Sequence, residues 1–117
     1  MTEIRVKRIY EAPSDDDGLR ILVDRIWPRG ISKESARLDA WWKDLSPSTE
    51  LRKAFDHDPA RWDDFRERFH RQLDESDLTA ALTAIKDKRV TFLFGAKEER
   101  YNNAVALREY FLDRLSN

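Results

Sequence analysis

The sequence predicts an α/β domain with a small, mainly parallel sheet and helices on both faces of that sheet. Two observations lead to this prediction. Residues 21–23 and residues 90–94 are continuous apolar runs, typical of strands that are covered on both sides. The long stretch between them carries helix start signals and apolar side chains at helical spacing. A strand, a helical excursion and a second apolar strand together indicate a parallel crossover.

Length and composition limit the class of protein. The chain has 117 residues, which fits one domain, and its net charge of −1 excludes a globally basic protein held on nucleic acid by bulk charge. No apolar run approaches the ~18 residues that a membrane span needs, and residues 1–7 lack the apolar stretch of a secretory signal. We therefore expect a soluble, cytoplasmic domain with no membrane partner.

Metal and cofactor sites are not predicted. The chain has no cysteine and only two histidines, His57 and His70, so it lacks thiolate ligands and cysteine nucleophiles. Its three glycines are too far apart to form a phosphate loop or a dinucleotide fingerprint. We expect no metal and no cofactor.

The first two strands lie near the N-terminus. Apolar and basic residues alternate within residues 4–10, which predicts a strand with one solvated face. The aspartates at 15–17 follow, and we interpret them as a solvated acidic loop, because a calcium loop needs spaced ligands and a distal glutamate. Residues 19–26 are predicted as the second strand, which ends before Pro28 because proline cannot donate to a sheet ladder.

Two helices are predicted next. Ser32 can cap a helix over residues 33–44, and its apolar side chains recur at helical spacing. These side chains are Leu38, Trp41, Trp42 and Leu45. Ser46 followed by Pro47 indicates the cap and first residue of a second helix that runs to about Phe55.

The remaining elements complete the order β-β-α-α-α-α-β-α. Asp58 and Pro59 begin a helix with an aromatic stripe, and Ser76 or Asp77 caps a shorter one. Residues 90–94 form the most apolar stretch and are predicted as the central buried strand. A last helix is predicted from about residue 102 to residue 115.

The candidate site lies where the two buried strands end. Ligands of open α/β sheets gather beyond the carboxyl ends of parallel strands. In this chain those ends are residues 24–30 and residues 95–97, and the second leads into the start of the last helix at residues 101–103. If the two strands are neighbours, these segments face one another.

Basic residues accumulate in the first of these segments. Between Gly18 and Arg37 they outnumber the acidic residues, and arginine offers a planar fork of donors that suits carboxylate or phosphate. One interpretation is an anion-binding pocket built from Arg25, Arg29 and Lys33. The alternative is that Arg25 pairs with a structural carboxylate while Arg29 and Lys33 are solvated.

Two residues are candidates for proton transfer, namely His57 and Asp24. His57 lies at a bend between two aspartates, which favour its charged form, although a capping or hydrogen-bonding role is the alternative. Asp24 could act as a general base or could orient an arginine. Asn102 and Asn103 cap the last helix in the simplest interpretation, and could also bind a ligand there.

The residues of this region resemble a known family. The segment Val23-Asp24-Arg25-Ile26-Trp27-Pro28-Arg29-Gly30, with Lys33, resembles the signature of the YeaO-like family of domains of unknown function (DUF488). Further similarity to it lies in residues 42–45, 47–48, 51–52, 55–58, 90–94 and 102–105, so residues 1–117 are expected to form a single YeaO-like domain. The resemblance implies a stand-alone bacterial-type domain with no agreed reaction. It directs attention to Asp24, Arg25, Arg29, Lys43, Arg52 and His57 as a group.

The same resemblance argues against histidine-dependent chemistry at one position. Family members often have histidine where this chain has Asn103, so histidine-dependent chemistry at that position is not expected here. Lys43 follows two tryptophans, and its ammonium group is expected to extend to solvent unless the site recruits it.

Two functions of different classes follow from these observations. The first is binding of an anionic small molecule, phosphorylated or nucleotide-like, in an arginine-rich cleft, with or without catalysis by His57 and Asp24. The second is a nucleic-acid-binding or transcription-regulator-like module. The first is favoured, because the basic residues between residues 47 and 88 alternate with acids and form no continuous basic face. The sequence decides neither the oligomeric state nor whether the domain is an enzyme.

Overall fold

Four parallel strands form the centre of the computed structural model, which describes residues 1–116. In chain order they are β1 (Glu3–Arg8), β2 (Leu19–Leu22), β3 (Ala40–Trp41) and β4 (Arg89–Phe94). Their order in the sheet is β1-β4-β2-β3, and every neighbouring pair is parallel. The predicted α/β class and the inner position of the apolar strand β4 are confirmed.

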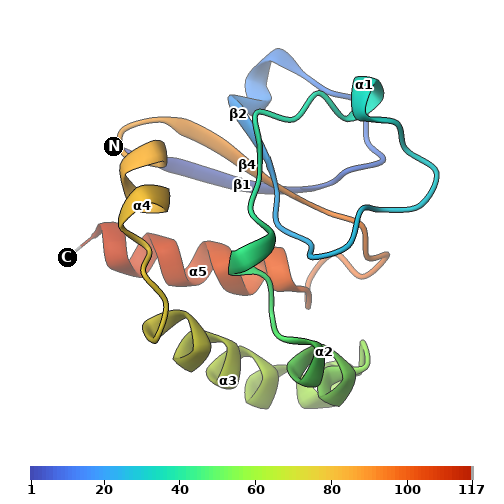
Figure 1. Ribbon diagram of the computed structural model, residues 1–117, viewed down its shortest axis with the longest axis vertical. Helices are drawn as coiled ribbons and strands as arrows, with labels where there is room; N and C mark the ends of the chain where they lie inside the picture. The colour runs from blue at the N-terminus through green and yellow to red at the C-terminus, as the bar shows by residue number, and fades with distance from the viewer. Residues whose placement is uncertain (117) are drawn as a thin grey trace.

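The main core lies between one face of the sheet and four helices. These are α2 (Thr49–Phe55), α3 (Trp62–Asp74), α4 (Thr79–Ile85) and α5 (Asn103–Leu115). Helix α5 contacts β1 and β4 directly, and α3 packs against α5 and α2, as Figure 1 shows. The side chains that α3 buries are those predicted from its aromatic stripe, namely Trp62, Phe65, Phe69 and Leu73.

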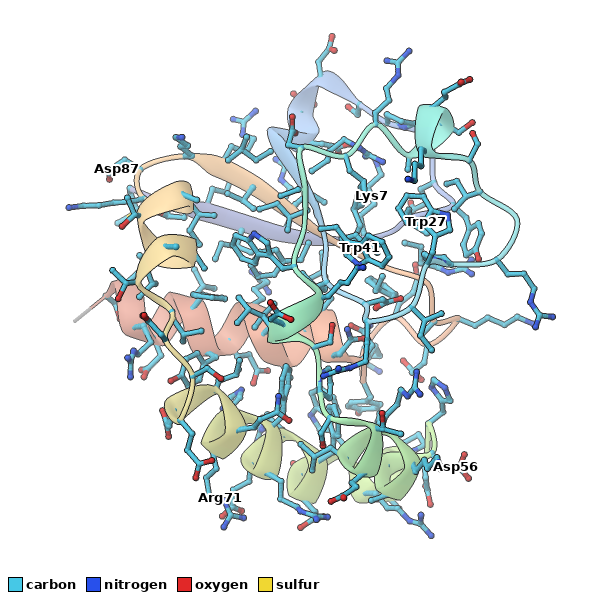
Figure 2. The ribbon with its side chains drawn as sticks, in the orientation of Figure 1. Lys7, Trp27, Trp41, Asp56, Arg71 and Asp87 are labelled. Atoms are coloured by element: carbon cyan, nitrogen blue, oxygen red, sulfur yellow. The ribbon has the colours of Figure 1, made fainter. Side chains whose placement is uncertain are left out.

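The other face of the sheet is covered by the single-turn helix α1 (Lys33–Ala36) and the loop around it. Leu22 and Leu93 are fully buried there against Ala36. Trp27 and Trp41 close this smaller core with an edge-to-face contact whose ring centroids are 5.3 Å apart (Figure 2). Helices therefore lie on both faces, but the second layer is mostly loop.

The predicted helix over residues 33–44 is wrong beyond its first turn. Arg37 adopts a left-handed conformation (φ 48°) that ends α1, and the chain then pairs with β2 as the short strand β3. Trp41 packs on the second face, whereas the next residue, Trp42, packs on the main core against Phe92 and Phe111. Successive strand residues point to opposite faces, so the apolar spacing that suggested one helical stripe serves two separate cores.

Two other local expectations are corrected. Ser46 does not cap α2, because its hydroxyl donates to the Val23 carbonyl oxygen at 2.8 Å; Ser48 accepts from the Leu51 backbone instead. The aspartates at 15–17 are not all solvated. Asp17 is only 4% exposed and accepts hydrogen bonds from Lys7 and Arg20.

No helix within residues 1–116 is both long and apolar enough to cross a membrane.

Candidate functional site

A cavity of about 260 Å³ lies where β2 and β4 end and α5 begins. It is the meeting point expected from the sequence, because β2 and β4 are parallel neighbours whose carboxyl ends share one edge of the sheet. Six of the residues singled out from the sequence line this cavity: Asp24, Arg25, Arg52, His57, Asn102 and Asn103. Their roles toward a ligand stay predictions.

Asp24 follows β2 and is fixed by donors from two other elements. Its Oδ2 accepts from the backbone N–H of Gly95 at 2.9 Å, just beyond β4. Its Oδ1 accepts from the side-chain amide of Asn103 at 3.0 Å. A Cβ added at Gly95 would lie 3.2 Å from Oδ2, so this position leaves little room for any side chain.

The environment of Asp24 acts on its ionisation in opposite directions. Burial raises the pKa of Asp24 above its ordinary value, because desolvation penalises the charged carboxylate. Hydrogen bonds from Asn103 and Gly95 and the positive charge of Arg52 lower the pKa, but they only partly offset the burial. The site therefore contains a carboxyl group that is harder to ionise than a surface aspartate.

The start of α5 is tied to this carboxylate. Asn102 caps the helix, since its Oδ1 accepts from the Val105 backbone N–H at 3.0 Å. Asn103 instead turns its amide toward β2, where it donates to the Val23 carbonyl oxygen as well as to Asp24, each at 3.0 Å. Thus Asn102 performs the predicted capping role, whereas Asn103 positions Asp24.

Two arginines supply positive charge to the cavity. Arg25 directly follows Asp24, and Arg52 reaches the cavity from α2. Both residues are exposed, and within residues 1–116 neither guanidinium forms a hydrogen bond or a close ion pair. Arg52 acts on Asp24 through charge at longer range. Their donors are free to meet an anion from solvent.

His57 is exposed at the rim of the cavity, immediately after α2. Asp56, labelled in Figure 2, and His57 both have positive φ angles, 47° and 55°. This left-handed pair reverses the chain between α2 and the short helical turn Pro59–Arg61. The imidazole lies beside Phe55, with ring centroids 6.4 Å apart.

The other residues of the wall are apolar or hydrogen-bonded within the fold. These residues are Ile26, Ser46, Pro47, Phe55, Phe65 and Ala96. None of them was a candidate site residue, although Ile26 and Ala96 belong to the two segments that the sequence placed at the site. Phe55 and Phe65 are stacked, with ring centroids 4.5 Å apart, and their helical spacing marks them simply as core. No periodicity signal distinguishes a buried ring that faces a cavity from one that faces another ring.

Three predicted residues do not line the cavity. Arg29 is exposed beyond Pro28, and its carbonyl oxygen accepts from the Tyr10 hydroxyl at 2.6 Å. Lys33 begins α1 on the other face of the sheet. Lys43 lies over the ring of Trp41, 4.1 Å from its centroid, in a cation–π contact. The expected pocket of Arg25, Arg29 and Lys33 is therefore not assembled; Arg25 is joined by Arg52 instead.

The arrangement combines two free guanidinium groups, one held carboxylate and a stacked aromatic wall. Guanidinium groups suit carboxylate or phosphate, and a held carboxylate suits a hydrogen-bond donor. Within the described residues there is no group of three or more metal-ligating side chains.

Comparison with known proteins gives a family match over nearly the entire chain. The family model described as the inactive DUF488-N3 subclade matches residues 3–117. The uncharacterized protein YeaO of Escherichia coli is 40% identical over 109 residues, which are 92% of this chain and 95% of that protein. An uncharacterized protein of Mycobacterium tuberculosis is 45% identical over 89 residues, 76% of this chain and 75% of its own length. No solved structure matches.

Proposed function

The chain belongs to the DUF488 family, and from this premise we propose that it binds an anionic small molecule, phosphorylated or nucleotide-like, in the cavity at the ends of β2 and β4. The observation that carries the proposal is the pair of unpaired guanidinium groups, Arg25 and Arg52, at a cavity that holds a single carboxylate. An anion placed between them gains charge-assisted hydrogen bonds that neither arginine makes within the described protein.

The shape of the cavity supports a small organic ligand. Its volume of about 260 Å³ is just below the ~300–1,000 Å³ typical of pockets for drug-sized ligands. The stacked rings of Phe55 and Phe65 form an apolar wall beside the charged groups. A compound with an anionic end and an apolar ring can contact both the charged groups and this apolar wall.

Binding without turnover is favoured over catalysis. The matching subclade is described as inactive. In addition, the side-chain amide of Asn103 already donates hydrogen bonds to Asp24 and to the Val23 carbonyl oxygen. His57 and Asp24 remain the residues predicted to move a proton if a bound compound is converted. The exposed imidazole of His57 can also donate to an anion at the rim.

The test is calorimetric titration and thermal unfolding with inorganic phosphate and phenyl phosphate, which differ in the apolar ring. We expect phenyl phosphate to bind more tightly than phosphate and to raise the unfolding temperature. Arg25→Ala and Arg52→Ala should each weaken binding of both probes. Arg71→Ala is the matched control, because Arg71 lies on the outer side of α3 (Figure 2) and is exposed.

Two results would count against the proposal. The first is the absence of binding by either probe at low salt. The second is equal weakening by Arg71→Ala, which would mean that only the overall charge matters. A titration with duplex DNA at two salt concentrations tests the nucleic-acid alternative, since phosphate contacts give a steep dependence on salt.

A further inference from the structure

We infer that the cavity recognises a phosphorylated sugar, free or as part of a nucleotide, and that Asp24 accepts hydrogen bonds from its hydroxyl groups. This inference rests on the proposed function and adds the chemical class of the ligand. It starts from the only carboxylate that lines the described cavity.

Asp24 is held in one orientation but is not saturated with donors. A carboxylate has about four lone-pair positions. Within the described residues, one oxygen accepts from the Gly95 backbone and the other from Asn103. These two donors bind different oxygens and come from different parts of the chain, after β4 and at the start of α5, so they fix the orientation of the carboxylate. The remaining lone pairs are available to a ligand in the cavity.

The charge of Asp24 decides which part of the ligand it can meet. A phosphate next to a carboxylate is repelled, whereas Arg25 and Arg52 attract it. The phosphate therefore belongs with the arginines, and an uncharged donor belongs with Asp24. A hydroxyl group on the same molecule is such a donor, and it would offset part of the burial that raises the pKa of Asp24.

A phosphorylated sugar carries both groups on a compact frame. Its phosphate and hydroxyls are separated by a few bonds, and a nucleotide adds a ring for the wall formed by Phe55 and Phe65. Acidic side chains bind ribose hydroxyls in this way at the ends of parallel strands in other α/β folds. Plain phosphate would use the arginines alone and leave Asp24 without a new partner.

The experiment compares ligands that differ only in hydroxyl groups. Wild-type protein is titrated with AMP and with 2′,3′-dideoxy-AMP, then with ribose 5-phosphate and with tetrahydrofurfuryl phosphate, its hydroxyl-free counterpart. We expect the hydroxylated member of at least one pair to bind about tenfold to hundredfold more tightly, the range for hydrogen bonds to a charged group. The pair that shows the preference identifies a nucleotide or a free sugar phosphate as the better ligand.

The variant Asp24→Asn assigns the preference to its side chain. It should bring the two members of the preferred pair to nearly equal affinity while leaving binding of the hydroxyl-free phosphate ester intact or improved. Arg52→Ala should weaken both members together.

Two outcomes overturn the inference while the proposed function stands. One is equal binding of hydroxylated and hydroxyl-free esters by the wild-type protein, which does not depend on the folding of any variant. The other is an unchanged preference in folded Asp24→Asn. If no phosphate ester and no inorganic phosphate binds, the proposed function fails and this inference fails with it.

Discussion

Asn103 donates its side-chain amide to Oδ1 of Asp24 at 3.0 Å, which joins the first residue of α5 to the segment that follows β2. The same amide donates to the carbonyl oxygen of Val23. These contacts connect segments that are about eighty residues apart in the chain, and they position one carboxylate at the cavity. Stability and ionisation at this point are therefore coupled.

Replacing Asn103 should destabilise the fold and shift Asp24. We expect Asn103→Ala to lower the free energy of unfolding by about 1–3 kcal/mol, because Oδ1 of Asp24 loses its donor and the Val23 carbonyl oxygen keeps only the Ser46 hydroxyl. The pKa of Asp24 should rise further, since the Asn103 hydrogen bond lowers it. Urea unfolding measures the first effect, and carboxyl NMR titration measures the second. Lys97→Ala, an exposed change nearby, should show neither effect.

The raised pKa of Asp24 predicts a dependence of stability on pH. The folded state holds the Asp24 proton more tightly than the unfolded chain, so it binds more protons at pH values above the ordinary pKa of 3.8. The contribution of Asp24 to the free energy of unfolding should therefore fall as pH rises from about 4, until the raised pKa is passed. Urea unfolding of the wild type and Asp24→Asn at a series of pH values isolates this contribution. A difference between the two proteins that stays constant with pH would contradict the assignment.

Asp17 should behave in the opposite way. Burial opposes its ionisation, but hydrogen bonds from the Ser14 backbone, Lys7 and Arg20 outweigh this effect and lower the pKa of Asp17. Its contribution to stability is then present above the ordinary pKa of 3.8 and is lost as pH falls through the lowered value. Asp17→Asn leaves the buried guanidinium of Arg20 without its counter-charge, which we expect to cost about 3–5 kcal/mol near neutral pH.

The control for Asp17 is in the same loop. Asp15 is exposed, and Asp15→Asn should change the free energy of unfolding by no more than about 0.5 kcal/mol. Chemical unfolding at neutral pH and at pH 3 compares both variants with the wild type. Equal losses for the two variants would show that the general charge of the loop matters, rather than the buried contacts of Asp17.

Two glycines test a steric prediction about the sheet. Gly18 and Gly30 both have positive φ angles, 65° and 80°. A Cβ at Gly18 would lie 2.2 Å from the Arg89 carbonyl oxygen, whereas nothing lies within 4 Å of a Cβ at Gly30. Gly30→Ala should cost about 1–2 kcal/mol from backbone strain alone, and Gly18→Ala should cost distinctly more because the start of β4 must move. Thermal unfolding that ranks the two variants in the reverse order would refute this.

Much of the fold could be predicted from local pattern. The two apolar runs became the inner strands β2 and β4, and the aromatic stripe of α3 became its buried side. Burial patterns of this kind depend on residues that are close together in the sequence. The predicted helix over residues 33–44 is wrong beyond its first turn, because the apolar spacing of residues 38–45 fits one face of a helix and fits equally a strand whose side chains pack in two different cores. Only the presence of β2 as a pairing partner decides between the two.

The sequence by itself determined the α/β class, the inner strands and the edge of the sheet where polar side chains gather, because each depends on composition and spacing along the chain. Tertiary structure alone decided which charges share the cavity: it brought Arg52 to Asp24 and left Arg29, Lys33 and Lys43 outside. Those outcomes depend on how the chain crosses between β2 and β4. They also depend on the position of Arg29 after Pro28, of Lys33 in α1 and of Lys43 over the ring of Trp41. Charge is a property of a residue, but proximity between charges is set by the packing of distant segments.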